Sequence, residues 1–325
     1  MLVRVPPADP ILDRTPEPPV NALTIALGNY GLTKPLKDGL VKTGRLPLSY
    51  APIEQIVPAM RRMCRNLEYD ICEMAFTTYV CARGYGLPFT AIPVFVTRNF
   101  HHWAIFYNTK SGIRTPKDLE GRKVGVNRGY TVTTGLWARG ILQSEYGVDL
   151  NKVTWIPTDD EHVAEFKAPG NVDYRHRGKA MKDLLLAGEI DAALGELALD
   201  TPEIQPLIPN ARDAAFDWFR RTGIYPINHG VVVKNTLLKE MPWIADELMA
   251  AFEQAKAIYL KDIAGAAGLS SWDKAAAQNA AVVGDPFPFG IEQNRKALEA
   301  ITRFAADQGM VPRKFTVEEL FTVPA

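Results

Sequence analysis

The chain has 325 residues, with 37 basic and 37 acidic side chains and so no formal net charge. This length allows one large domain or two ordinary ones, and an apolar fraction of 47% argues against a largely disordered chain. The neutral balance disfavours a dedicated nucleic-acid binder, and no apolar run reaches the roughly 18 residues that a transmembrane helix needs.

Residues 1–21 contain six prolines in the first twenty positions, a composition that predicts an extended arm. This segment has no apolar core of signal-peptide length, so we expect a cytoplasmic protein. The three cysteines are an odd number and do not have metal-ligand spacing, which favours reduced, buried thiols over a disulfide framework. They are Cys64, Cys72 and Cys81.

From residue 23 onward, strand and helix patterns alternate along the chain, which predicts an α/β fold with a largely parallel sheet. Glycines after two of the helical patterns, at Gly147 and Gly309, mark where those helices should end. The predicted strands are 23–27, 69–76, 92–97, 103–107, 123–126, 153–156, 190–194 and 230–233. The predicted helices are 53–67, 133–146, 178–187, 242–261 and 291–308.

Two phrases indicate a particular architecture. Residues 115–126 read TPKDLEGRKVGV, and residues 184–194 read LLLAGEIDAAL. In this order and spacing they resemble the type II periplasmic-binding-protein fold. The resemblance implies two α/β lobes with a ligand cleft between them. Lobe one would comprise 22–105 and 230–325, and lobe two 106–229.

Three further segments resemble the 4,5-dihydroxyphthalate decarboxylase family, a soluble enzyme branch of that fold. They read DICEMAFTTYV (70–80), PVFVTRNFHHWAIFY (93–107) and PINHGVVVK (226–234). The family's second segment usually reads R-x-F-R-H-S, which Arg98 and His102 match, whereas His101 and Trp103 depart from it. The substrate is therefore expected to be 4,5-dihydroxyphthalate or a related aromatic acid.

The reaction that this resemblance implies is the loss of CO2 from an electron-rich aromatic acid, with no cofactor. Direct loss would leave an unstabilised aryl carbanion. Protonation of the ring carbon that bears the carboxylate, assisted by a para hydroxyl, gives a dienone-like intermediate instead. Such a site needs a proton donor, an acceptor at the hydroxyl, and cations for a carboxylate that stays.

Proton-transfer candidates are scarce, because the chain has only five histidines. His102 and His229 lie in the resembling segments next to presumed crossover strands, and imidazole titrates near neutral pH. On a regular strand His101 would face away from His102. Glu73 lies inside an apolar strand pattern and is the expected acceptor for a catechol hydroxyl. The other two histidines lie in polar segments and are expected to be solvated: His162 and His176.

Anion binding is indicated by eight basic and only two acidic residues between Arg98 and Arg139. Arg98 and Arg128 occupy strand-to-turn junctions, where a guanidinium could hold a substrate carboxylate with two hydrogen bonds. The start of the helix predicted at 133–146 offers free backbone N–H groups. The remaining expected substrate contacts are Tyr130, Thr131, Thr133, Thr77, Thr78, Asn29 and Tyr30.

Other functions fit the same fold. A non-catalytic binding protein for a small aromatic or carboxylated ligand would need the anion contacts but no proton donor. A different enzyme on this scaffold, acting in pyrimidine or thiamin-precursor synthesis, is a third possibility that the arginine positions disfavour. No metal site is indicated. We expect no nucleic-acid or membrane partner, and a homo-oligomer.

Overall fold

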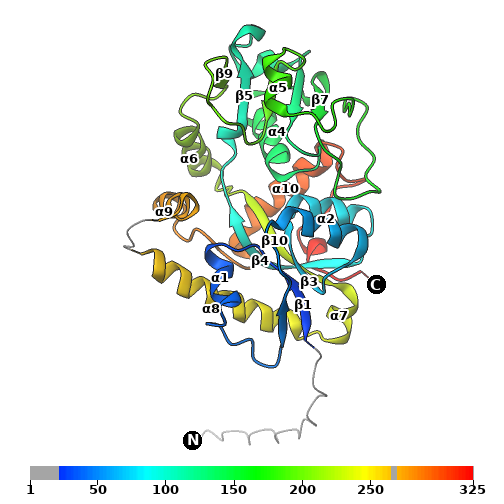
Figure 1. Cartoon of the computed structure of the whole chain (residues 1–325), viewed down its shortest axis with the longest axis vertical. Helices are drawn as coiled ribbons and strands as arrows, with labels where there is room; N and C mark the ends of the chain where they lie inside the picture. Colours follow the sequence, from blue (N-terminus) through cyan, green and yellow to red (C-terminus); the bar gives the residue numbers. More distant parts are fainter. Residues whose placement is uncertain (1–21, 265–268, 325) are drawn as a thin grey trace, which may run out of the picture.

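A computed structural model describes residues 22–264 and 269–324; the predicted arm at 1–21 lies outside this part of the chain. Two five-stranded mixed sheets lie one above the other along the long axis of the molecule (Figure 1). Lobe one holds β2 (Leu48–Tyr50), β1 (Leu23–Ala26), β3 (Ile71–Ala75), β10 (Ile227–Lys234) and β4 (Phe89–Arg98), in this spatial order. Lobe two holds β7 (Thr154–Pro157), β6 (Lys123–Val126), β8 (Ala192–Leu194), β5 (Ile105–Asn108) and β9 (Ile204–Pro206).

Each sheet contains one antiparallel strand. In lobe one β10 runs antiparallel to both β3 and β4, and in lobe two β5 runs antiparallel to both β8 and β9. The other pairings within the sheets, β1 with β2 and β3, and β6 with β7 and β8, are parallel. Each antiparallel strand is the first one after the chain has crossed from the other lobe. The predicted α/β fold with two lobes is therefore confirmed.

Helices cover both faces of the lobe-one sheet, which explains why its strands are apolar on both sides. Ile71 of β3 packs in the cluster that includes Leu248 of α8, whereas its neighbour Cys72 packs in the cluster that includes Met60 of α2. The helices are α1 (Lys34–Lys37), α2 (Ile56–Asn66), α3 (Phe76–Gly84), α4 (Thr133–Tyr146), α5 (Met181–Leu186), α6 (Ala211–Thr222), α7 (Asn235–Glu240), α8 (Ile244–Ile263), α9 (Ser271–Val283) and α10 (Arg295–Asp307).

The two lobes share a continuous core where α10 packs against α4 (Figure 1). Phe304 of α10 meets Trp137 of α4 edge-on, with ring centroids 5.9 Å apart. A Cβ atom at Gly140 would lie 2.4 Å from the Phe304 ring, so this close helix contact requires glycine. The packing between the lobes therefore depends on one small residue in α4.

Two crossover segments, 99–104 and 223–226, connect the lobes. Hydrogen bonds join each segment to the end of the strand that flanks the other. Arg98 donates from Nη1 to the Tyr225 carbonyl (2.8 Å), and the Asn99 N–H donates to Asn228 Oδ1 (3.0 Å). The strand predicted at 103–107 begins only at Ile105, because His102–Ala104 forms a 3-10 turn. Within the described residues, no helix has the length and apolar character to cross a membrane.

Candidate active site

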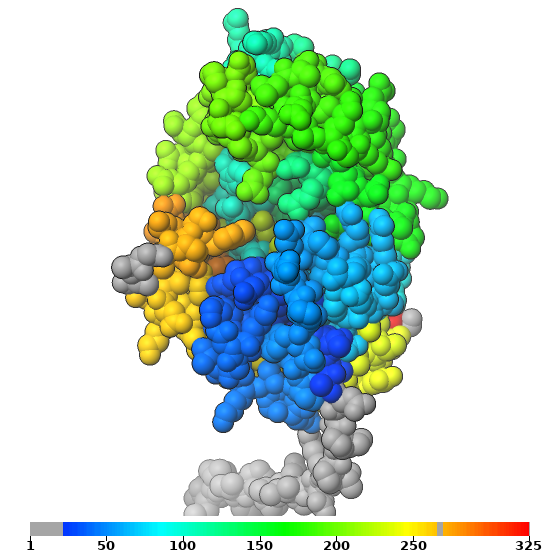
Figure 2. Space-filling model, in the orientation of Figure 1, coloured from blue at the N-terminus to red at the C-terminus, as the bar shows by residue number. Residues whose placement is uncertain are grey.

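A cleft of about 390 Å³ lies between the lobes, beneath the recess that separates the green upper part from the blue and orange lower part in Figure 2. Both lobes, the crossover segment 99–104 and α9 contribute to it. Its described lining is Val57, Met60, Ala75, Thr78, Asn99, His101, Trp103, Asn127, Arg128, Val132, Thr133, Thr134, His162, Gly195, Glu196, Asn228, His229, Ser271, Trp272 and Ala275.

His229 and Glu73 form an imidazole–carboxylate pair at the lobe-one side of this cleft. His229 Nδ1 lies 2.6 Å from Glu73 Oε1. The sheet register explains the contact: His229 pairs with Ala75 across β10 and β3, and Val231 pairs with Glu73, so the two side chains are diagonal neighbours on one face. Glu73 is fully buried, and the His229 side chain is 22% exposed.

Two further donors hold the Glu73 carboxylate. The Gly28 N–H donates to Oε2 (2.8 Å), and the Tyr30 hydroxyl donates to Oε1. A Cβ atom at Gly28 would lie 2.3 Å from the Tyr30 ring, so the turn after β1 requires glycine for this approach. Burial, followed by the nearby Glu73 charge, raises the pKa of Tyr30 well above its usual value and keeps the hydroxyl a donor.

This arrangement fixes the tautomer of His229. An ionised carboxylate can only accept hydrogen bonds, so Nδ1 carries a proton and Nε2 is the nitrogen available to the cleft. The hydrogen bond to the buried carboxylate also fixes the orientation of the ring. Glu73 itself cannot reach a ligand, contrary to the expectation that it accepts from a catechol hydroxyl, because Gly28, Tyr30 and His229 surround it.

The two histidines of the crossover segment 99–104 differ in their surroundings. His101 lines the cleft and contacts Asn228 Oδ1 through Nε2 (3.1 Å), and burial lowers its pKa to about 3. His102 packs edge-on against Trp218 of α6, with ring centroids 5.3 Å apart, outside the cleft lining. The expectation that His102 faces the ligand is corrected: the 3-10 turn directs its ring into the interior of lobe two.

His162 differs from its expected environment. It was expected in solvent, but it is 7% exposed and lines the cleft from the loop after β7. Burial, assisted by Arg61 and Arg128, lowers its pKa to about 4, so the ring is neutral near pH 7. His176 lies outside the cleft and pairs with Glu189 (3.3 Å).

The two arginines that look equivalent in sequence have different positions. Arg98 is buried at the crossover, where its guanidinium donates to the Tyr225 carbonyl and to Asn294 Oδ1 and lies over the Tyr225 ring. Burial lowers its pKa to about 10. It does not line the cleft. Arg128 does line the cleft, has an exposed side chain and adopts a left-handed backbone with φ 75°. Arg128 is the only Arg or Lys in the described lining.

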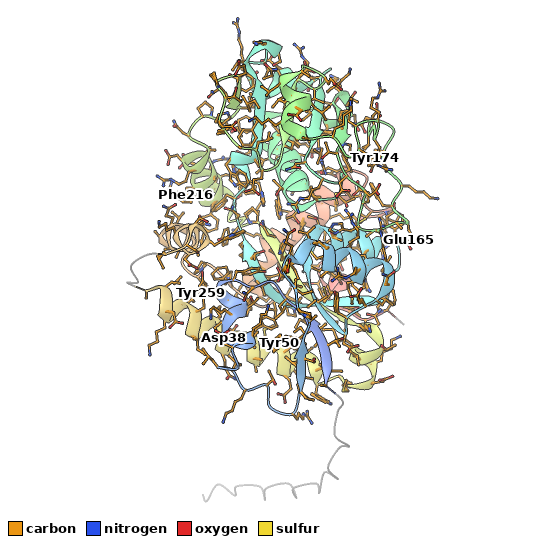
Figure 3. All side chains as sticks on the ribbon, in the orientation of Figure 1. Asp38, Tyr50, Glu165, Tyr174, Phe216 and Tyr259 are labelled. Atoms are coloured by element: carbon orange, nitrogen blue, oxygen red, sulfur yellow. The ribbon has the colours of Figure 1, made fainter. Side chains whose placement is uncertain are left out.

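The predicted anion site at the start of α4 is partly filled by the protein itself. Glu161 accepts from the Tyr130 N–H (2.5 Å) and from both the N–H and the hydroxyl of Thr131 (3.0 and 2.6 Å). Tyr174 also donates to Glu161 (2.8 Å), and it is labelled in Figure 3. Tyr130 and Thr131 are therefore not available to a substrate. The first helical residues, Thr133 and Thr134, line the cleft.

Of the remaining predicted contacts, one lines the cleft and two do not. Thr78 lines the cleft, whereas Thr77 donates to the Thr131 carbonyl (2.9 Å) and lies 3.0 Å from the Thr133 hydroxyl. Asn29 is exposed and lies outside the cleft lining. Among the described residues, no group of three or more His, Cys, Asp or Glu side chains is arranged to hold a metal ion.

Comparison with known proteins identifies the family. Residues 68–262 match the NMT1/THI5 like family. A 4,5-dihydroxyphthalate decarboxylase from Comamonas testosteroni is 32% identical over 252 residues, covering 73% of this chain and 76% of the relative. The chain belongs to the 4,5-dihydroxyphthalate decarboxylase family. The enzyme of the same name from Pseudomonas putida is 30% identical over 211 residues, covering 61% of this chain and 81% of that relative.

A solved structure supports the fold alone. The alkanesulfonate-binding protein SsuA from Xanthomonas axonopodis pv. citri has a TM-score of 0.56 and 16% identity, and the match covers 94% of this chain and 99% of that one. Membership of a decarboxylase family confirms the expectation of a carboxy-lyase, and the SsuA match confirms the binding-protein architecture.

Two tryptophans line the cleft; the sequence singled out Trp103 only as a departure from the family segment and gave no signal for Trp272. Trp103 follows the histidine pair, and Trp272 is the second residue of α9; they are 36% and 57% exposed. Trp272 stacks with Tyr30 at a centroid distance of 6.4 Å. Tyr259 of α8, labelled in Figure 3, anchors α9 by donating to Asp273 Oδ1 (2.6 Å). No pattern in residues 264–290 indicated that a helix would reach the cleft, although exposed aromatics are suited to stacking on an aromatic ligand.

Proposed function

We propose that this protein decarboxylates a hydroxylated aromatic carboxylic acid, with 4,5-dihydroxyphthalate as the leading substrate and protocatechuate as the product. The observation that carries the proposal is the His229–Glu73 pair at the cleft (2.6 Å). A binding protein needs no proton donor backed by a buried carboxylate, whereas ring protonation requires one. The names of both curated relatives support the same reaction.

In the proposed chemistry His229 reacts as the imidazolium, with protons on both nitrogens, and donates the Nε2 proton to the ring carbon that carries the leaving carboxylate. The bond from that carbon to the carboxylate then breaks, CO2 leaves, and the bonding pair restores the aromatic ring. The ring carbon keeps the proton from His229, which is replaced from solvent. Glu73 is a positioning residue, since it holds the imidazole with Nε2 directed to the cleft.

The charges of the cleft suit a substrate that keeps one carboxylate. Arg128 can hold the carboxylate that stays, assisted by the N–H groups of Thr133 and Thr134 at the start of α4. The described lining offers no second Arg or Lys to the leaving carboxylate, and it includes apolar side chains such as Val57 and Met60. Because an unpaired carboxylate is disfavoured beside apolar groups, its loss as neutral CO2 is favoured.

The test is incubation of the purified protein with 4,5-dihydroxyphthalate in D2O, following CO2 release and ring absorbance. Protocatechuate with one deuterium, at the carbon that lost the carboxylate, is expected. Tight binding without turnover of this compound or related hydroxybenzoates would favour a receptor instead.

His229→Gln should lower kcat by about 100-fold or more, because a positioned general acid contributes on that order. His176→Gln is the matched control, since His176 lies outside the cleft. Near-normal turnover in His229→Gln, with His176→Gln also normal, would remove His229 from the mechanism.

A further inference from the structure

The proposed reaction also requires an acceptor for the proton of the para hydroxyl. Glu73 was the sequence-based candidate, but it is fully buried behind His229. Among the described residues, the cleft contains two other imidazoles, His101 and His162. His101 uses Nε2 to contact Asn228, and its Nδ1 atom is sealed from the cleft.

In His162, unlike His101, Nε2 is free of protein partners among the described residues. Its Nδ1 atom is buried without a partner, so Nε2 is the nitrogen available to a ligand. The ring belongs to lobe two, whereas His229 belongs to β10 in the lobe-one sheet, so the two histidines approach the cleft from different lobes. A flat ring bound between the lobes could therefore contact one imidazole from each.

The charges around His162 keep it a neutral acceptor. Arg61 and Arg65 of α2 and Arg128 of the loop after β6 act against a positive charge on the ring, and Asp159 only partly offsets them. Together with burial they lower its pKa to about 4. In the tautomer that carries its proton on Nδ1, a neutral imidazole can accept a hydrogen bond at Nε2 from a phenolic hydroxyl, which an imidazolium cannot.

The loop that carries His162 is held by residues from the opposite lobe. Arg61 donates from Nη2 to Asp159 Oδ2 (2.9 Å) and to the Asp160 carbonyl (3.1 Å), and Arg65 donates from Nη2 to the Glu161 carbonyl (2.9 Å). Because α2 belongs to lobe one, these contacts fix the His162 loop from across the cleft. The position of His162 therefore depends on how the two lobes meet.

We propose that His162 is a second catalytic residue, which accepts the proton of the substrate hydroxyl para to the leaving carboxylate. This inference rests on the proposed function. Once His229 has protonated the ring carbon, the para hydroxyl becomes strongly acidic, so a weak base is sufficient. His162 takes that proton and a dienone forms; when CO2 leaves, the electrons return to the ring and the oxygen regains the proton from His162.

The placement of Arg128 agrees with this assignment. In 4,5-dihydroxyphthalate, the carboxylate that stays and the hydroxyl para to the leaving group are on ring carbons separated by one other carbon. Arg128 lies close enough to His162 for its charge to act on the imidazole. One side of lobe two can therefore hold both groups, and lobe one can supply the proton to the ring carbon.

Two ligands that do not react separate this inference from the proposed function. Protocatechuate carries a carboxylate and two hydroxyls, and benzoate carries the carboxylate alone. We expect His162→Leu, which removes the acceptor, to raise the Kd of protocatechuate about 10-fold, as loss of one hydrogen bond would, and to change the Kd of benzoate less than twofold, measured by calorimetry. His176→Gln should change neither.

Kinetics give the second readout. His162→Leu should lower kcat for 4,5-dihydroxyphthalate, and the factor by which kcat falls should be at least ten times the factor by which KM rises. If leucine is not tolerated, His162→Ala, which only removes atoms at the cleft, is used for both measurements. If the variant loses equal affinity for protocatechuate and benzoate, or loses affinity for neither, the assignment is overturned whatever the turnover assay shows. If the wild-type protein does not turn over 4,5-dihydroxyphthalate but the variant selectively loses affinity for protocatechuate, the proposed reaction is overturned. His162 would then belong to a subsite that only binds a hydroxyl.

Discussion

Replacing Glu73 by glutamine tests whether the buried carboxylate acts through His229. The side chain keeps its size, but one oxygen becomes an NH2 group and the charge is lost. Three donors converge on the carboxylate: the Gly28 N–H, the Tyr30 hydroxyl and His229 Nδ1. Whichever oxygen is replaced, the new amide N–H faces a donor, so at least one buried donor loses its acceptor.

The magnitude follows from these contacts. A hydrogen bond to a charged group is worth about 1.5–3 kcal/mol, which corresponds to roughly a 10- to 150-fold loss in kcat if the bond to the imidazolium acts in the transition state. The orphaned donor should in addition lower the free energy of unfolding by about 1–3 kcal/mol. KM should change little, because Glu73 does not line the cleft.

The assay is steady-state turnover of 4,5-dihydroxyphthalate, with urea unfolding measured on the same samples. Tyr30→Phe is the matched control, since it removes a different partner of Glu73 and keeps the charge and the His229 contact. We expect Tyr30→Phe to lose less than tenfold in kcat. If Glu73→Gln is less stable but retains kcat within twofold of the wild type, Glu73 has only a packing role.

Two other predictions concern charge. Arg128→Met should raise KM roughly 10- to 100-fold. Arg98→Met should leave KM within twofold and lower Tm, because Arg98 binds Tyr225 and Asn294 inside the crossover. The reverse pattern would contradict the assignment of Arg128 to the substrate. Burial lowers the pKa of His102 and His162 to about 4, against about 6.5 in the unfolded chain. Between these values the unfolded state binds more protons, so stability falls as pH drops below 6.5, by about 2 kcal/mol per histidine at pH 5. Urea unfolding at pH 7 and pH 5 measures this loss, which His102→Gln should reduce by about 2 kcal/mol; an unchanged pH dependence in that variant would refute it.

Several elements were determined by local sequence alone. The helix predicted at 133–146 and the strand predicted at 123–126 match α4 and β6 residue for residue. Gly147 ends α4 with a left-handed residue, as a C-terminal glycine should. By contrast α3 was not predicted. It is buried over nearly all its residues, so it has no polar face and no amphipathic period to recognise.

The sequence motifs also identified the family and singled out His229 and Glu73 as separate candidates, whereas their contact follows from the register of β10 and β3. The tertiary structure decided which charged groups face the ligand. Arg98 and Arg128 occupy similar strand-to-turn junctions, yet Arg98 turns into the crossover, where it finds a carbonyl and an amide oxygen. His162 lies in a polar stretch and is buried nonetheless, because Arg61 and Arg65, about a hundred residues earlier, bind its loop from the other lobe. Local sequence records neither contact, since each depends on how two distant segments approach across the cleft.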